Sequence, residues 1–162
     1  MVKDVGGWYA LIDCSRDTRL EGLVGSCRER ACLFKGKIDP QLANVAPWLV
    51  RIDEQEALMS TWQMHGRGQS WGLMALSQLS LDPLQRFFRR FLQAMLPDGM
   101  VVTFRFYDPR VFNTFICAAE QAEREPWFEG VEQYAVEAEG GEGLHQYRLT
   151  NGKLYDGEKL VG

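Results

Sequence analysis

Hydrophobic positions along the chain alternate between short runs and helix-like spacing. Apolar runs at residues 8–13, 31–34 and 48–52 predict strands, because each is short and bounded by polar residues. After the first and third runs, apolar residues three and four apart predict helices over residues 19–30 and 54–65. The first part of the chain therefore indicates strands and helices in alternation.

The same alternation continues through the middle of the chain. Residues 70–77 predict a buried strand, and residues 100–107, which are β-branched or aromatic almost throughout, predict the strongest strand. A helix is predicted between them over residues 84–95, because its apolar side chains recur on one face. That stripe consists of Leu84, Phe87, Phe88, Phe91, Leu92 and Met95. We expect the stripe to enter the core.

Asp-Pro pairs mark three expected helix starts. They are Asp39-Pro40, Asp82-Pro83 and Asp108-Pro109. An aspartate at the N-cap accepts hydrogen bonds from the free N–H groups of the first turn, and proline at the next position loses no donor that the helix uses. The Leu-Pro-Asp-Gly turn at residues 96–99 is expected to close the helix over residues 84–95.

After Glu129 the chain changes to a period of two. The period is broken by Gly140-Gly141 and Asn151-Gly152, which predicts a β-hairpin or meander. The whole chain, residues 1–162, therefore predicts one α/β domain with a mixed β-sheet flanked by helices. We expect this sheet to be parallel in its crossover part and antiparallel at its C-terminal edge, where residues 132–162 form an acidic hairpin extension.

Composition and charge narrow the functional classes. The chain has 162 residues, of which 46% are hydrophobic and 25% charged, enough for a core that needs neither disulfide nor metal. A net charge of −4 argues against nucleic-acid binding. Up to Arg110 there are 14 Lys and Arg against 12 Asp and Glu, and from Val111 onward 4 against 10. The acidic end indicates either a solvated hairpin region or a second contact surface.

Export and membrane insertion are not expected. The first residues lack the order of a signal peptide, and the longest uncharged stretch, residues 68–81, is too short and polar to span a bilayer. The four cysteines are irregularly spaced and far from both histidines, so we expect no zinc site, no other metal and no cofactor. These features favour a location of the protein in the reducing cytoplasm.

Sequence signatures of catalysis are weak. The glycine-rich residues 65–72 follow a predicted helix and precede a predicted strand, which is the reverse of a phosphate-binding loop. Residues 68–72 have the Gly-x-Ser-x-Gly spacing, but they precede a predicted strand and do not follow one, so no strand-turn-helix nucleophile elbow is predicted there. No His-Glu-x-x-His motif occurs. Cys14 directly follows the first strand but has no identifiable activating group. We therefore expect no catalytic residue.

A cationic face is predicted on the helix over residues 84–95. Arg86, Arg89 and Arg90 lie three and four residues apart, opposite the apolar stripe. They form either a solvated face or a docking site for an acidic partner surface. For docking, we expect the double change Arg89→Glu, Arg90→Glu to weaken partner capture at an almost unchanged melting temperature.

A polar cluster is predicted at the strand ends. Arg105 is expected inside the sheet, where a buried guanidinium needs a carboxylate, and Asp13 or Asp108 is its expected partner. With Arg110, these residues form either a structural ion-pair network or the site of a small phosphate- or metal-dependent enzyme. A thermal-shift screen with nucleotides and divalent metals separates the two interpretations.

Several segments, taken in order, resemble a known family. They are WYALID, CLFKG, APWLVRID, SWGLMALS, DPLQRFFRRFL and PDGMVVTFRFYDPRVF. Together they resemble the adaptor-chaperones of bacterial type VI secretion, known as Tap or TEC, over residues 8–131. The resemblance implies a cytoplasmic, non-enzymatic protein that recognises a toxic effector and loads it onto the VgrG tip of the secretion spike. Its most specific element covers residues 97–111.

The chain departs from the family pattern in three respects. Cys14-Ser15 follow the first-strand aspartate where the family often has glycine and a small residue, and Phe88 stands where a polar histidine is frequent. Many members also continue into a helical C-terminal lobe, so this chain resembles a minimal adaptor or a fragment. We expect its partner contacts at Arg86, Arg89 and Arg90 and at a strand-end set. That set consists of Tyr107, Asp108 and Arg110.

Overall fold

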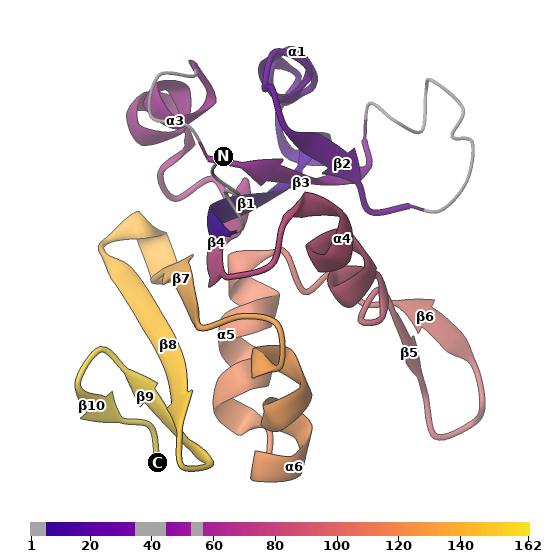
Figure 1. Cartoon of the computed structure of the whole chain (residues 1–162), viewed down its shortest axis with the longest axis vertical. Coiled ribbons are helices and arrows are strands. Elements are labelled where there is room, and N and C mark those ends of the chain that lie inside the picture. The colour runs from indigo at the N-terminus through magenta and orange to yellow at the C-terminus, as the bar shows by residue number, and fades with distance from the viewer. Residues whose placement is uncertain (1–5, 35–44, 53–56) are drawn as a thin grey trace, which may run out of the picture.

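The computed structural model describes residues 6–34, 45–52 and 57–162, and its central feature is an eight-stranded sheet (Figure 1). The strands lie in the order β10-β9-β8-β7-β4-β1-β3-β2, and every neighbouring pair is antiparallel. They are β1 (Gly7–Asp13), β2 (Arg30–Cys32), β3 (Pro47–Arg51), β4 (Gly72–Ser77), β7 (Gln133–Glu137), β8 (Leu144–Thr150), β9 (Lys153–Asp156) and β10 (Lys159–Leu160).

The α/β fold class is confirmed, but the prediction of a parallel crossover part is wrong. β1 lies between β3 and β4, and both neighbours run opposite to it, so that Leu11 is paired with Leu49 on one side and with Leu73 on the other. The segments between these strands bring the chain back beside β1 in the reverse direction, whereas a parallel neighbour needs a full crossover. An order of strands and helices along a sequence does not specify this direction.

Both faces of the sheet are covered over β1, which explains why this strand is apolar at consecutive positions. Tyr9 and Leu11 point to one face, hereafter the first face, and Ala10 and Ile12 point to the other, the second face. All four side chains are fully buried.

Different helices cover the two faces. Side chains of α4 (Leu81–Arg89) and α5 (Pro109–Ala118) belong to the first-face core. Side chains of α1 (Arg19–Gly25), α3 (Ala57–Thr61) and the π-helical turn η2 (Trp62–Gly66) belong to the second-face core. The helix predicted over residues 19–30 is therefore shorter, and the one predicted over residues 54–65 ends in a π turn, with residues 53–56 outside the described part.

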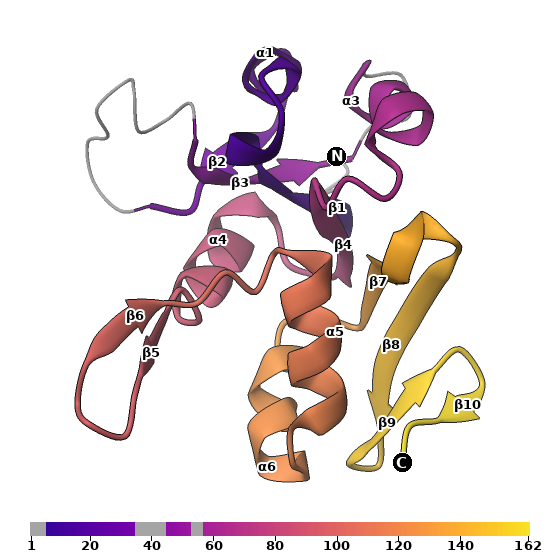
Figure 2. The same ribbon diagram turned by 180° about the vertical axis from the view of Figure 1, so that it is seen from behind.

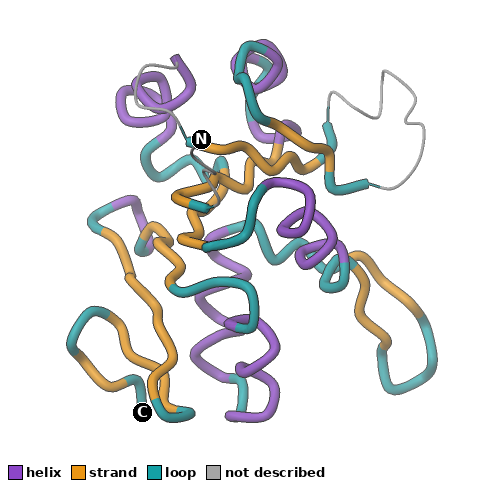
Figure 3. Tube along the Cα trace, viewed as in Figure 1, coloured by secondary structure: helices purple, strands orange, loops and turns teal. Residues whose placement is uncertain are grey.

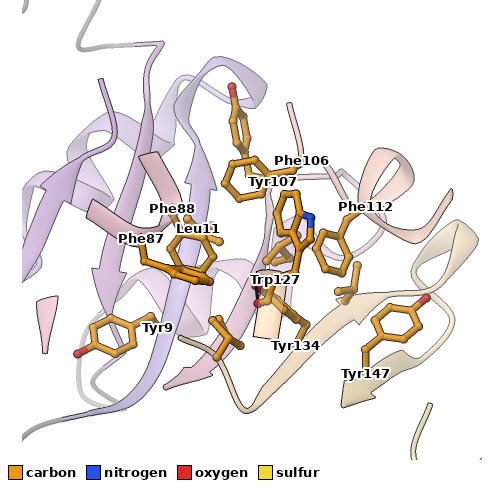
Figure 4. Packing of buried hydrophobic residues seen from close by; sticks show 14 of the residues in the cluster. Tyr9, Leu11, Phe87, Phe88, Phe106, Tyr107, Phe112, Trp127, Tyr134 and Tyr147 are labelled. Carbon is orange, nitrogen blue, oxygen red and sulfur yellow. Dashed lines mark hydrogen bonds between the residues drawn. The ribbon is translucent and has the colours of Figure 1, made fainter. Parts of the chain in front are cut away.

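The first-face core is mainly aromatic, and Trp127 is at its centre. This residue belongs to the short helix η3 (Glu125–Phe128), which follows α6 (Gln121–Arg124). Its ring stacks on Phe91 at a centroid distance of 4.0 Å and meets Phe106 at 5.1 Å. Figure 4 shows the indole between Phe106 and Phe112. Trp127 therefore joins the segment after α4, the segment before α5 and, through Phe112 and Phe115, α5 itself.

The predicted helix over residues 84–95 and strand over residues 100–107 both differ from the structure. α4 ends at Arg89, and a separate ribbon follows, made of β5 (Gln93–Met95) and β6 (Val101–Thr103). The Leu-Pro-Asp-Gly turn forms the tip of this hairpin, because Gly99, at φ 89°, donates its N–H to the Leu96 carbonyl. The turn signal was correct, but it joins two strands and does not end a helix.

Of the three expected Asp-Pro helix starts, two are confirmed, and one of the two aspartates is the N-cap. Asp108 is the N-cap of α5 and accepts a hydrogen bond from the Arg110 N–H at 2.9 Å. A helix also begins at Asp82-Pro83, but Asp82 lies inside the first turn of α4 and Ser80 occupies the N-cap, so only the expected N-cap role of Asp82 is wrong. Asp39 lies outside the described residues.

The predicted C-terminal meander is confirmed. β7 to β10 pair successively and extend the sheet from β4 outward. β8 turns into β9 through Asn151-Gly152, both with positive φ, which is typical of a tight hairpin. The short helix η4 (Glu139–Gly141) lies in the turn between β7 and β8. None of the helices in the described part is long and apolar enough to cross a membrane.

Candidate partner-binding surface

A groove lies on the second face, beyond the helices that cover β1. The second-face side chains of β8 include Leu144 and Gln146, and both are exposed. α3 lies beyond the upper end of the β7–β8 pair (Figure 1), and its Met59 lines the same hollows as Leu144 of β8. The groove thus has a sheet floor and one helical wall.

Two adjoining hollows of about 410 and 550 Å³ make up this groove. The residues that line both are Met59, Gln63, Met74, Ala135 and Leu144. Strand register explains the floor, because Met74 is paired with Ala135 and paired residues point to the same face. Most of these side chains are methionine, alanine or leucine. Methionine side chains are flexible, so the lining can adjust its shape to the side chains of a bound segment.

Glu137 lies at one end of the groove. Its Oε2 accepts a hydrogen bond from the Gly68 N–H at 3.0 Å, whereas its Oε1 is buried and has no hydrogen-bond partner. The same residue also lines a further hollow of about 400 Å³, together with Arg110 and Asn113. Glu137 therefore lies in the wall between the groove and this further hollow, hereafter the adjacent hollow.

Two closely packed turns hold Glu137 in place. Gly68 and Gly141 both have positive φ, near 75°. A Cβ atom on Gly141 would lie 2.6 Å from the Gly68 nitrogen, so the turns can approach only because this position lacks a side chain. Asn113 on α5 adds a hydrogen bond of 2.9 Å to the Glu137 carbonyl. The Gly68 N–H thus holds the carboxylate at Oε2, and Asn113 holds the backbone of Glu137.

The three arginines predicted as one cationic face have different surroundings. Arg89 is half-buried and donates to the carbonyls of Cys32, Leu33 and Phe34 at 3.0 to 3.3 Å. Arg90 is exposed and pairs with Glu129 at 3.4 Å. Arg86 is exposed. Arg89 therefore supports the end of β2, and the expectation that its replacement leaves the melting temperature unchanged no longer holds.

Replacing Arg89 by methionine is expected to lower the free energy of unfolding by about 1–3 kcal/mol. The three carbonyls lose a charged donor while the length of the side chain is nearly kept. Chemical unfolding measures the loss. Arg86→Met is the matched control on the same helix, with an expected change within about 0.5 kcal/mol. Equal losses in the two variants would contradict a structural role of Arg89.

The predicted strand-end set is only partly at the surface. Tyr107 is 3% exposed, and burial, followed by the charge of Asp13, raises the pKa of its hydroxyl to about 12. Asp108 and Arg110 form a two-bonded ion pair, with Nη2 to Oδ2 at 2.7 Å and Nε to Oδ1 at 3.1 Å. The ring of Tyr107 therefore belongs to the core, and Arg110 is the member of the set that lines a hollow.

The Asp108 carboxylate is expected to make stability depend on pH. Burial alone would raise its pKa, but hydrogen bonds from the Arg110 side chain and backbone outweigh burial, and the pKa is lowered. Such a group stabilises the fold above its unfolded pKa and loses this contribution as the pH falls through the folded pKa.

Asp108→Asn keeps a suitable N-cap but removes the charge. We expect wild type to exceed this variant by up to about 1 kcal/mol at pH 7. The difference should shrink as the pH falls below about 4. Urea unfolding at pH 7 and pH 3, at equal ionic strength, measures it. A difference of the same size at both pH values would count against the ion pair.

The expected ion pair of Arg105 with Asp13 is not present. Arg105 lies beyond the end of β6 and is exposed, so the prediction that it is inside the sheet is wrong. Asp13 accepts hydrogen bonds from the backbone and hydroxyl of Ser15, with which it caps the short helix η1 (Cys14–Arg16). Among the described residues, no ion pair joins Arg105 to Asp13 or Asp108. Asp13 and Arg105 act in opposite directions on the Tyr107 hydroxyl, since Asp13 raises its pKa and Arg105 lowers it.

The carboxylates of the alternative enzyme site are engaged in helix capping. Asp13 caps η1 and Asp108 caps α5. Burial, then the neighbouring Asp13, raises the pKa of the Cys14 thiol to about 12, so this thiol is protonated at neutral pH. Within the described ranges, no three His, Cys, Asp or Glu side chains are grouped as a metal site.

A second apolar surface is the hairpin of β5 and β6. The exposed side chains at its end are Met95, Leu96, Met100 and Val101. Figures 1 and 2 show the hairpin projecting from the body on the side away from β8 to β10. Asp98 is the only charged residue between Gln93 and Thr103. Figure 3 shows that this two-stranded ribbon lies apart from the main sheet.

Sequence reasoning missed the residues of the groove. Met74, Ala135 and Leu144 belong to three different strands, and only the strand order β8-β7-β4 brings them together. The sequence did contain a signal for Glu137. It lies in the period-two run after Glu129, two residues beyond Ala135, and residues two apart on a strand point to the same face of the sheet. That run was interpreted only as a hairpin.

Comparison with known proteins gives one match. A sequence profile of the family described as Domain of unknown function (DUF4123) matches residues 8–125. No curated protein and no solved structure matches the chain. The matched residues begin with β1 and end at the start of η3, so they include the second-face helices, α4, the hairpin and α5.

Proposed function

The chain belongs to the DUF4123 family, and from this premise we propose that it is an adaptor-chaperone of bacterial type VI secretion. In this proposal it is a cytoplasmic, non-enzymatic protein that binds a toxic effector and loads it onto the VgrG spike. The family is associated with effector adaptors of this secretion system, in agreement with the resemblance of the ordered sequence segments.

The observation that carries the proposal is the groove on the second face. Its two hollows are large enough to hold a few side chains of a bound segment. The lining is mainly apolar and also includes Gln63, Gln133 and Gln146. Leu144 is 49% exposed at its edge, although a leucine gains free energy when it is covered. A partner segment that fills the groove supplies this cover.

An adaptor needs a second, separate surface, and the β5–β6 hairpin offers one. Its four exposed apolar side chains form a patch of the kind that marks protein contacts. It projects on the side away from β8, so two partners can be held without overlap (Figure 2). In this proposal the groove and the hairpin replace the arginine face of α4 as the main contact surfaces.

Affinity purification from the source cells tests the proposal. A tagged chain is captured from cells that express the secretion system, washed in moderate salt, and its bound proteins are identified by mass spectrometry. We expect a VgrG protein and a toxin to co-purify. Recovery of neither, from cells shown to express both, would contradict the adaptor function.

A further inference from the structure

The buried oxygen of Glu137 is unusual in this protein. A buried polar atom without a hydrogen bond destabilises the fold, and the cost is larger for a charged group. In the described part of the chain, Glu137 Oε1 is the only buried side-chain oxygen or nitrogen without a partner. This oxygen has almost no solvent-accessible surface in the free chain, but the Glu137 side chain lines the end of an apolar groove. A donor bound there reaches the oxygen when the side chain turns toward it. The position is therefore suited to a donor that the free chain does not supply.

The charged groups around Glu137 leave this position open. Arg110 lines the adjacent hollow, but its guanidinium is held by Asp108 through two hydrogen bonds. Arg67 lines the groove and is exposed, and among the described residues no ion pair joins it to Glu137. Glu139 lines the adjacent hollow and adds a second negative charge nearby. The balance at this end of the groove favours a positively charged ligand group.

We propose that the groove binds a segment of the effector in which one arginine or lysine donates to Glu137. Apolar side chains next to that basic residue would then lie on Met74 and Leu144. The inference rests on the proposed adaptor function and adds the chemistry of the bound segment. An ion pair within an apolar groove also gives selectivity, because a segment without the basic residue leaves the Glu137 carboxylate unpaired.

Selection of a displayed library of random peptides on the full chain tests this chemistry. We expect the selected peptides to share one basic residue flanked by apolar residues. Their dissociation constants are then measured for the wild type, Glu137→Gln and Glu158→Gln. Loss of the charge-assisted bond should weaken binding about tenfold or more in Glu137→Gln. Glu158→Gln carries the same change of charge at an exposed position outside the groove and should bind within about twofold of the wild type.

The melting temperature of Glu137→Gln provides an independent readout. The amide oxygen can still accept from the Gly68 N–H, and the variant no longer buries an unpaired charge. It should therefore melt no lower than the wild type when free. A lower melting temperature would mean that the carboxylate has a stabilising partner within the chain, which would overturn the inference.

Failure of this inference and failure of the adaptor function give different results. Peptides without a common basic residue, or equal binding by Glu137→Gln and wild type, would overturn the inference. If the tagged wild type still captures the effector and the spike protein, the adaptor function stands. If Glu137→Gln loses the spike protein and keeps the effector, the proposed occupant is wrong. Selective loss of the effector supports the inference.

Discussion

Replacing Leu144 by arginine is expected to reduce capture of the partner that fills the groove by at least about tenfold. Leu144 is the cross-strand partner of Glu137, and paired residues lie close enough for their side chains to meet. The new guanidinium would occupy the groove and pair with the free oxygen of Glu137. The variant should therefore fold as stably as the wild type while excluding the partner. Quantitative co-purification with the effector and the spike protein measures the loss.

Leu160→Arg is the matched control for this prediction. Leu160 is also 49% exposed, but it lies on the edge strand β10 and not in the groove. It should capture both partners as the wild type does. Leu144→Ser, which removes only the apolar contact, should have an intermediate effect. Unchanged capture by Leu144→Arg would remove the groove from the partner interface.

Replacing Trp127 by alanine is expected to lower the free energy of unfolding by about 3–5 kcal/mol. The indole is 4% exposed and has five phenylalanine neighbours with ring centroids between 4.0 and 6.1 Å. Its loss leaves a cavity among these five rings. For a chain of this length the melting temperature should fall by roughly 6–20 °C. Circular dichroism during urea and thermal unfolding measures both quantities.

Two further variants define the origin of that loss. Met64→Ala removes a side chain that is 76% exposed and should change stability by no more than about 0.5 kcal/mol. Trp127→Phe retains an aromatic ring at the centre and should recover part of the loss. A loss below about 1 kcal/mol in Trp127→Ala would mean that the core does not depend on the indole.

Local patterns located many of the elements but not all of their ends. Period-two alternation after Glu129 identified the meander, and the Asp108-Pro109 pair identified the start of α5, because both depend on neighbouring residues only. The end of α4 was missed, since Phe91 and Leu92 continue its helical spacing beyond Arg89. These two side chains pack on the same core from outside the helix. Periodicity reports burial and does not by itself report the hydrogen bonds of the backbone.

The predicted binding residues show the same limit more clearly. Arg89 was placed correctly on the polar side of α4, but its guanidinium is used by the carbonyls after β2, more than fifty residues earlier in the chain. Arg124, which sequence reasoning did not single out, is similarly engaged with the carbonyls of Ile116 and Cys117. A pattern identifies a charged face, but the backbone groups that approach the face determine whether it is free to bind a partner.

The sequence by itself determined the α/β class, the C-terminal meander, the cap of α5 and the family to which the chain belongs. These follow from local propensity and from the order of segments along the chain. Tertiary structure alone decided the direction of the strands, the meeting of Met74, Ala135 and Leu144 in one groove, and the unpaired oxygen of Glu137. The physical reason is that these features depend on which strands lie side by side, and that choice is made by packing of both sheet faces over the whole chain.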